Sequence, residues 1–132
     1  MRMIGIKEGV EMLKIKGPVV YFDVDDTLVS WYADDKLETA FVSFYDASTC
    51  LNYKLKVIEE NVEAMRCHKL RGHAIVVWSA GGAEWAATVV AKLGLTEIVD
   101  LCIAKPTWFY DDLKAEEFLP ETNRRYIYTE MT

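Results

Sequence analysis

The sequence has few cysteines and histidines, and it has no long apolar run. Cys50, Cys67 and Cys102 are odd in number and far apart, with no CxxC pair among them. This spacing argues against a disulfide framework and against a thiolate zinc site, and it is typical of a reducing compartment. No stretch approaches the roughly 18 apolar residues that a membrane span requires. We therefore expect a cytoplasmic protein with no membrane partner.

The chain also lacks the excess of positive charge that nucleic-acid-binding proteins usually carry. Its 132 residues include 15 Lys and Arg against 21 Asp and Glu, which gives a formal net charge of −6. A field of this sign repels polyanions and anionic membranes. The length suits one domain, and the contents of hydrophobic residues (52%) and charged residues (27%) are ordinary for a globular protein. We predict a single domain over residues 1–132.

Apolar runs and helical periodicities alternate along the chain. Buried strands are predicted at residues 19–24, 73–78 and 98–104, with shorter strands at 108–110 and 124–128. Helical spacing predicts helices at 57–71 and 83–93, a helical turn near 113–118 and a short amphipathic helix within residues 1–17. This alternation is typical of an α/β fold with a mostly parallel sheet.

Between the first strand and the first long helix, the pattern changes to strict alternation. Residues 39–45 and 51–57 alternate apolar and polar side chains across a turn-like link, which predicts a β-hairpin. Trp31 and Tyr32 precede it and could either pack on the hairpin or stack against a substrate. Trp78 and Trp85 are expected in the core.

Polar side chains follow the apolar strands at the point where each strand ends. They are Asp23, Asp25, Ser79, Lys105, Asp111 and Asp112. Because the carboxyl ends of parallel strands meet at one edge of a sheet, and ligands bind there, we expect these six residues to converge on one crevice.

The expected cluster has the chemistry of a phosphate site. Four carboxylates in one pocket repel each other, and Mg²⁺ would relieve this while also binding a substrate phosphate. Ser79 is followed by Ala80, Gly81 and a helix start, which offer a hydroxyl and backbone N–H groups to an anionic oxygen. With Lys105 and an aspartate aimed at phosphorus, the pattern favours phosphoryl transfer through an aspartyl-phosphate.

Each of these residues also has an ordinary structural interpretation. Asp23 and Asp25 could form an Asx turn after a strand, and the Ser79 segment could be a plain loop. Lys105 alone would be a surface lysine. Asp111 and Asp112 alone would most often cap the following helix.

The order and spacing of these residues resemble the haloacid dehalogenase superfamily of aspartate-nucleophile phosphohydrolases, over about residues 18–128. The four motifs of that family correspond here to Asp23-Val24-Asp25-Asp26-Thr27-Leu28, Val76-Val77-Trp78-Ser79, Lys105-Pro106 and Tyr110-Asp111-Asp112. Asp26 stands where many members have glycine.

The resemblance implies a Rossmann-like sheet with helices on both faces, and a small hairpin flap at about residues 30–56 in place of a cap domain. It implies that Asp23 is the nucleophile and a Mg²⁺ ligand. Asp25 would be the general acid and base, with its carbonyl on the metal, and Thr27 would support its loop. The resemblance further implies phosphate contacts from Thr27, Ser79, Ala80, Gly81 and Lys105, and a metal site completed by Asp111 and Asp112.

The expected function is therefore that of a Mg²⁺-dependent phosphomonoesterase acting on a small phosphate ester or a nucleotide. Asp25 favours a phosphatase over a dehalogenase, because the dehalogenases of this superfamily do not need an aspartate there. Two alternatives stay open: a phosphatase of polynucleotide 3′ ends, and a non-catalytic binding module that kept the fold.

Overall fold

Three parallel strands form the central sheet of the molecule. The computed structural model describes residues 3–7, 10–13, 15, 17–31 and 41–126. β3 (Val19–Asp23), β7 (Ala74–Ser79) and β8 (Leu101–Ala104) are hydrogen-bonded in the order β3-β7-β8. Their registers pair Asp23 with Trp78 and Ser79 with Ala104, so the three carboxyl ends share one edge. The predicted parallel α/β sheet is confirmed.

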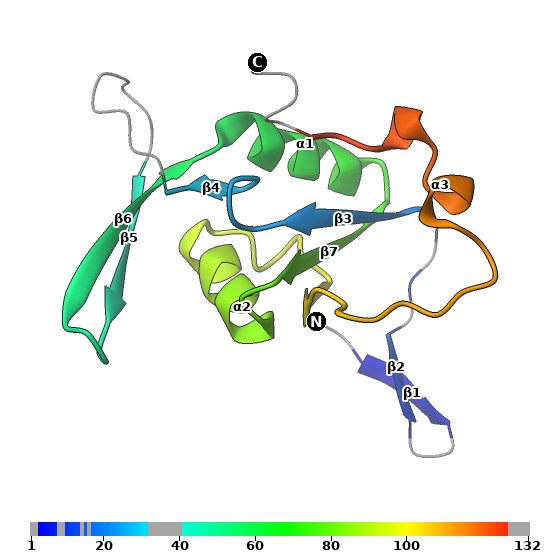
Figure 1. Cartoon of the computed structure of the whole chain (residues 1–132), viewed down its shortest axis with the longest axis horizontal. Helices are drawn as coiled ribbons and strands as arrows, with labels where there is room; N and C mark the ends of the chain where they lie inside the picture. The colour runs from blue at the N-terminus through cyan, green and yellow to red at the C-terminus, as the bar shows by residue number, and fades with distance from the viewer. Residues whose placement is uncertain (1–2, 8–9, 14, 16, 32–40, 127–132) are drawn as a thin grey trace.

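The two long helices are also confirmed, as α1 (Glu59–Leu70) and α2 (Ala83–Lys92) (Figure 1). α1 has acidic residues in its first turn and basic residues in its last, which complements the helix dipole. α2 lies between Gly82 and Gly94, both with positive φ. Gly94 is a typical helix stop, because glycine adopts this backbone conformation without strain.

The main hydrophobic cluster lies on one face of the central sheet. Phe22, Ile75 and Val77 share that face, and they cluster with the buried residues of both α1 and α2. On the opposite face, Val19 and Tyr21 of β3 remain 43% and 49% exposed. α1 and α2 therefore pack on the same face of the sheet. The prediction that helices cover both faces is wrong for these two helices. Right-handed crossovers between strands added in one direction place successive helices on the same side.

The predicted hairpin is present as β5 (Phe41–Asp46) and β6 (Leu51–Val57). A third strand, β4 (Val29–Ser30), pairs antiparallel with β6 and was not predicted. Because β4 follows the loop after β3 directly, it joins this second sheet to the carboxylate loop. Phe44, Leu55 and Val57 belong to the main core, so the flap is packed into the domain.

Both ends of the described chain differ from the prediction. β1 (Met3–Lys7) and β2 (Val10–Leu13) pair antiparallel where a helix was expected. The apolar spacing at Ile6, Val10 and Leu13 fits a helix. However, Gly5 costs a helix about 1 kcal/mol, and the β-branched residues nearby favour extended backbone.

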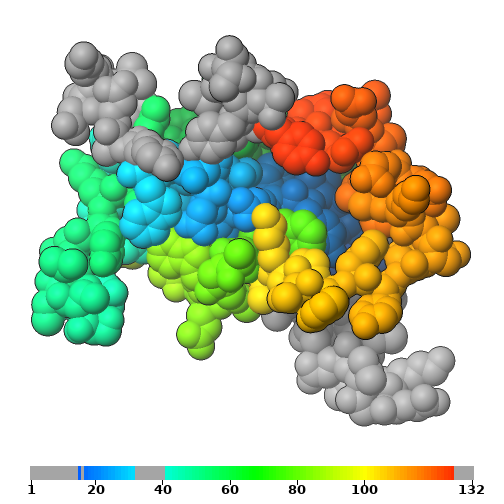
Figure 2. All heavy atoms as spheres, in the orientation of Figure 1, coloured from blue at the N-terminus to red at the C-terminus, as the bar shows by residue number. Residues whose placement is uncertain are grey.

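After β8 the chain forms α3 (Ala115–Phe118) and a 3₁₀ turn, η1 (Glu121–Asn123). Residues 108–110 form no strand, and Trp108 and Tyr110 are 81% and 92% exposed. Residues 124–126 form no strand either, and residues 127–128 lie outside the described part. Figure 2 shows the segment after β8 (yellow to orange) on the surface, at the end opposite the flap. No helix in the described ranges is long and apolar enough to cross a membrane.

Candidate functional site

The two carboxylates of the first motif lie at the end of β3 and in the tight loop that follows it. The Val24 carbonyl accepts hydrogen bonds from the backbone N–H groups of Thr27, Leu28 and Val29, at 3.2, 2.9 and 3.2 Å. Val24 and Leu28 are fully buried, so the loop is held by its apolar residues. This anchoring leaves Asp23 and Asp25 partly exposed at the sheet edge.

The amino end of α1 holds the same loop from the other side. The Asn61 side-chain amide donates to the Thr27 carbonyl at 2.9 Å, and the Ile58 N–H donates to the Leu28 carbonyl at 2.9 Å. The loop carbonyls thus have partners, and the carboxylates project from a fixed backbone.

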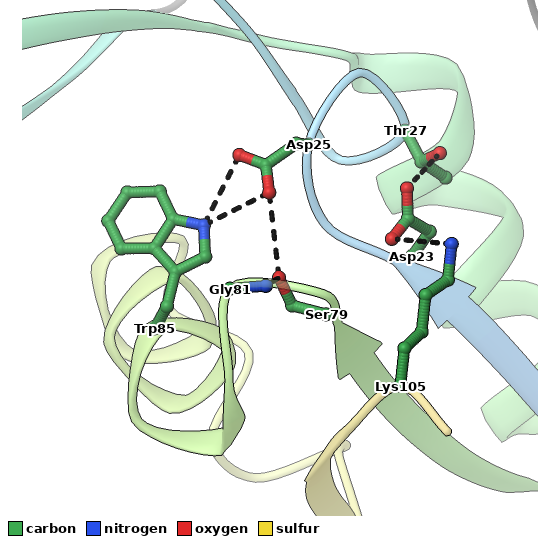
Figure 3. Close-up of polar contacts among 7 residues, drawn as sticks. All are labelled: Asp23, Asp25, Thr27, Ser79, Gly81, Trp85 and Lys105. Atoms are coloured by element: carbon green, nitrogen blue, oxygen red, sulfur yellow. Dashed lines mark hydrogen bonds and ion pairs between the residues drawn. The ribbon is translucent and has the colours of Figure 1, made fainter. Parts of the chain in front are cut away.

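Asp23 faces Lys105 and Thr27 (Figure 3). Lys105 Nζ lies 3.4 Å from Asp23 Oδ1, and Thr27 Oγ1 donates to Asp23 Oδ2 at 3.4 Å. The Lys105 ammonium also lies 5.9 Å from the centroid of the Trp78 ring. The sequence-predicted nucleophile and lysine are therefore neighbours, although they are 82 positions apart in the chain.

Asp25 points toward α2 and carries a different set of contacts (Figure 3). Trp31 Nε1 donates to Asp25 Oδ1 at 2.8 Å. Trp85 Nε1 lies 3.2 Å from Oδ1 and 3.3 Å from Oδ2. Ser79 Oγ is 3.5 Å from Oδ2, at the limit of a hydrogen bond. One carboxylate thus receives two indole N–H groups.

Ser79 lies beneath this carboxylate and is fully buried. Its Oγ accepts the Gly81 N–H at 3.0 Å, and its carbonyl accepts the N–H groups of Gly82 and Lys105. The Ser79 hydroxyl and the Gly81 N–H, which were expected to contact a phosphate, are hydrogen-bonded to each other within the turn. Ala80 is exposed.

The acidic pair of the predicted fourth motif does not join this cluster. Asp111 and Asp112 are exposed, and Asp111 Oδ1 accepts the Leu113 N–H at 3.0 Å. That hydrogen bond is the main reason why the pKa of Asp111 lies below its ordinary value, with a smaller contribution from Asp112. Asp111 thus stabilises the turn ahead of α3, which is close to the structural alternative for this pair.

The Mg²⁺ site expected from Asp23, Asp25, Asp111 and Asp112 stays a prediction. Among the described residues, no three His, Cys, Asp or Glu side chains are grouped closely enough to hold a metal ion. Asp23 is paired with Lys105, and Asp25 is turned toward the two indoles.

Two residues of the cluster were not predicted as site residues. Trp85 was expected to be core, and Trp31 was left open between packing and substrate contact. Trp31 both contacts the flap and binds Asp25, while Tyr32 lies outside the described residues. Indole N–H is a donor only, so Trp31, six positions after Asp25, could have been recognised from the sequence as a partner of that carboxylate. Trp85, sixty positions away, carries no such signal.

We compared the chain with family models, with curated proteins and with solved structures, and none of the three comparisons finds a match.

Proposed function

We propose that this protein is a phosphomonoesterase of the haloacid dehalogenase type, which acts through a covalent phosphate on Asp23. The observation that carries the proposal is the pairing of Asp23 with Lys105, beside a second carboxylate held separately at the same sheet edge. A carboxylate with an adjacent ammonium can approach an anionic phosphate, because the lysine offsets charge on both groups.

The proposed reaction has two steps. Asp23 attacks phosphorus, an Oδ–P bond forms, and the ester P–O bond breaks while Asp25 gives its proton to the leaving alkoxide. In the second step a water attacks the same phosphorus. The water loses a proton to Asp25, the Oδ–P bond breaks, and inorganic phosphate leaves.

Lys105 and the loop contacts support these steps. The lysine would stabilise the negative charge that gathers on the phosphoryl oxygens, and Thr27 would restrict rotation of the Asp23 carboxylate. Mg²⁺, when bound, would supply further charge neutralisation. Because the described carboxylates do not gather around one point, the cation is a separate part of the proposal.

Substrates in the proposal are small phosphate esters or nucleotides. The net charge of −6 disfavours a long polyanion. A polynucleotide 3′ end is the alternative substrate, and a steep dependence of its hydrolysis on salt would favour it.

A second candidate, a non-catalytic anion-binding module, is favoured by one observation. The Ser79 hydroxyl, which was expected to meet the phosphate, is buried and already hydrogen-bonded. Such a module would bind phosphate at Lys105 without turning it over.

The experiment compares hydrolysis of p-nitrophenyl phosphate by the wild type and by Asp23→Asn, with Mg²⁺ and with a chelator. We expect Asp23→Asn to lower kcat/KM by on the order of a thousandfold or more, since it removes the nucleophile and keeps its shape. Glu97→Gln removes an exposed carboxylate elsewhere and serves as the matched control.

Three outcomes separate the possibilities. Activity that needs Asp23 supports the phosphatase, and its loss with the chelator supports the Mg²⁺ requirement. Equal activity of wild type and Asp23→Asn would refute the mechanism. A folded wild type that binds phosphate and hydrolyses neither this ester nor oligonucleotide 3′-phosphates would favour the binding module.

A further inference from the structure

We propose that Trp31 and Trp85 are positioning residues that clamp the Asp25 carboxylate in one orientation, and that the flap keeps this clamp closed. The inference rests on the function proposed above, because it explains how Asp25 is aimed at a leaving group. The clamp itself is a geometric feature that can be tested without any activity.

The first step of the argument is that Asp25 needs an external support. The terminal torsion of an aspartate is broad, so a carboxylate on a loop can rotate freely unless it is bound. No lysine or arginine among the described residues forms an ion pair with Asp25. Its side-chain partners in the described part of the chain are the two indoles and, at 3.5 Å, Ser79.

The second step concerns which oxygen is held. Trp31 and Trp85 both donate to Oδ1, at 2.8 and 3.2 Å. Among the described residues, the contacts of Oδ2 are longer, 3.3 Å to Trp85 and 3.5 Å to Ser79. The clamp therefore fixes Oδ1 and leaves Oδ2 as the oxygen that can carry a proton to a leaving group.

The third step is that the two indoles are themselves held rigidly. Their rings stack on each other, with centroids 6.2 Å apart and planes at 29°. Tyr53 of β6 packs edge-on against Trp31 at 5.6 Å, and Phe44 of β5 packs against Trp85 at 5.1 Å. Both strands of the flap thus contribute an aromatic ring that restrains the clamp.

The turn after β7 makes room for this arrangement. A Cβ atom added to Gly81 would lie 3.1 Å from Cδ1 of Trp85 and 3.3 Å from Ser79 Oγ. The absence of a side chain at Gly81 therefore allows the Trp85 ring to lie close to the turn, within reach of Asp25. Trp31 remains 45% exposed, so the clamp borders the surface where a leaving group would sit.

The test uses the chemistry of the leaving group. p-Nitrophenolate leaves without help from an acid, whereas the alkoxide of glycerol phosphate needs a proton from Asp25. Comparing kcat/KM for the two esters isolates formation of the phosphoenzyme. Trp31→Phe and Trp85→Phe keep the ring and remove the N–H donor, and Trp108→Phe changes an 81% exposed indole as the matched control.

We expect Trp31→Phe and Trp85→Phe to lower kcat/KM for glycerol phosphate by roughly 10- to 100-fold and that for p-nitrophenyl phosphate by less than about threefold. Trp108→Phe should change neither value. Equal losses on both esters would indicate structural damage, and no loss on either would mean that the indoles do not position Asp25. Both results overturn the proposal.

A measurement that needs no activity separates this inference from the proposed function. The indole N–H resonances of Trp31 and Trp85 in a ¹H–¹⁵N spectrum should shift in Asp25→Asn, while that of Trp108 stays in place. Unchanged Trp31 and Trp85 resonances would overturn the clamp. If they shift and wild type hydrolyses neither ester, the clamp exists and the proposed function fails.

Discussion

Asp26, which directly follows Asp25 in the loop after β3, has the most strained backbone of that loop. Its φ of 63° lies in the left-handed region, which non-glycine residues rarely adopt. Its Oδ1 is buried and has no hydrogen-bond partner among the described residues. Its N–H donates to the Val29 carbonyl, so the backbone bond that closes the loop is made at this strained residue.

We predict that Asp26→Gly stabilises the protein by about 1 kcal/mol, because it relieves the left-handed backbone and removes a buried, unsatisfied oxygen. We expect this gain in stability to exceed the loss of stability that comes from the greater conformational entropy of glycine in the unfolded chain. Urea denaturation at pH 7 measures the change in the free energy of unfolding. Asp26→Ala keeps the backbone strain and should gain less, so equal stability of the two variants would contradict this explanation.

At this scale the sequence predicts residues that stand at strand ends and misses those that reach the site from elsewhere. Asp23, Asp25 and Lys105 follow apolar runs, and parallel strands must deliver such residues to one edge. Trp85 is 60 positions from Asp25, on a helix whose apolar pattern marks it as core. Only the packing of α2 against the sheet directs its N–H to the carboxylate.

Among the elements, the junction of α1 with β7 carries a pair of histidines. His68 Nδ1 in the last turn of α1 lies 2.9 Å from Nδ1 of His73, which precedes β7. Only one of the two nitrogens can donate in this contact, so the other must be unprotonated. Burial lowers the pKa of His68, and the positive charges of His73, Arg71 and Arg125 lower it further.

This arrangement predicts a stability that falls in mild acid. Because the pKa of His68 is lower in the folded state than its unfolded value of 6.5, the unfolded chain binds more protons just below that pH. The stabilisation is therefore complete above pH 6.5 and is lost as the pH falls toward the folded-state pKa. Urea denaturation from pH 8 to 5.5 measures this slope.

His68→Gln removes the titrating group and should flatten the slope across this range. The charge of His73 lowers the pKa of His68 less than burial does. His73→Gln should therefore flatten the slope only in part. A His68→Gln variant that keeps the wild-type slope would show that other groups are responsible.

The type of an element was predictable where the local residue pattern and the strand pairing in the fold agree. It was not predictable where the two differ. The hairpin of β5 and β6 follows from alternation around a turn. The aromatic run at 108–110 has the propensity of a strand, but propensity does not provide a neighbouring strand to pair with. The short β4 is defined only by its pairing with β6, so its two residues carry no signal of their own.

On the scale of the whole molecule, the parallel sheet was predictable from the sequence. The face of the sheet that the helices cover was not. Apolar runs indicate that strands are buried, but they do not fix the strand order. The order β3-β7-β8 places both crossovers in the same direction, and this puts α1 and α2 against one common core. The exposed Tyr21 on the other face follows from that order and could not be read from its own strand.

The clamp on Asp25 also has a consequence for how the chain folds. Its two hydrogen bonds span very different lengths of chain, six positions for Trp31 and sixty for Trp85. Contacts between distant residues form late, because the intervening chain must first be ordered. The contact with Trp85 further requires β7 to have docked beside β3.

We therefore predict that refolding restores the Trp31 environment before that of Trp85, and that the proposed phosphatase activity returns no earlier than the Trp85 phase. Stopped-flow fluorescence would follow each indole alone in a background where the other three tryptophans are phenylalanine. Activity that returned while Trp85 was still solvated would contradict this order. A site whose groups meet only through long-range contacts leaves a partly folded chain without its chemistry.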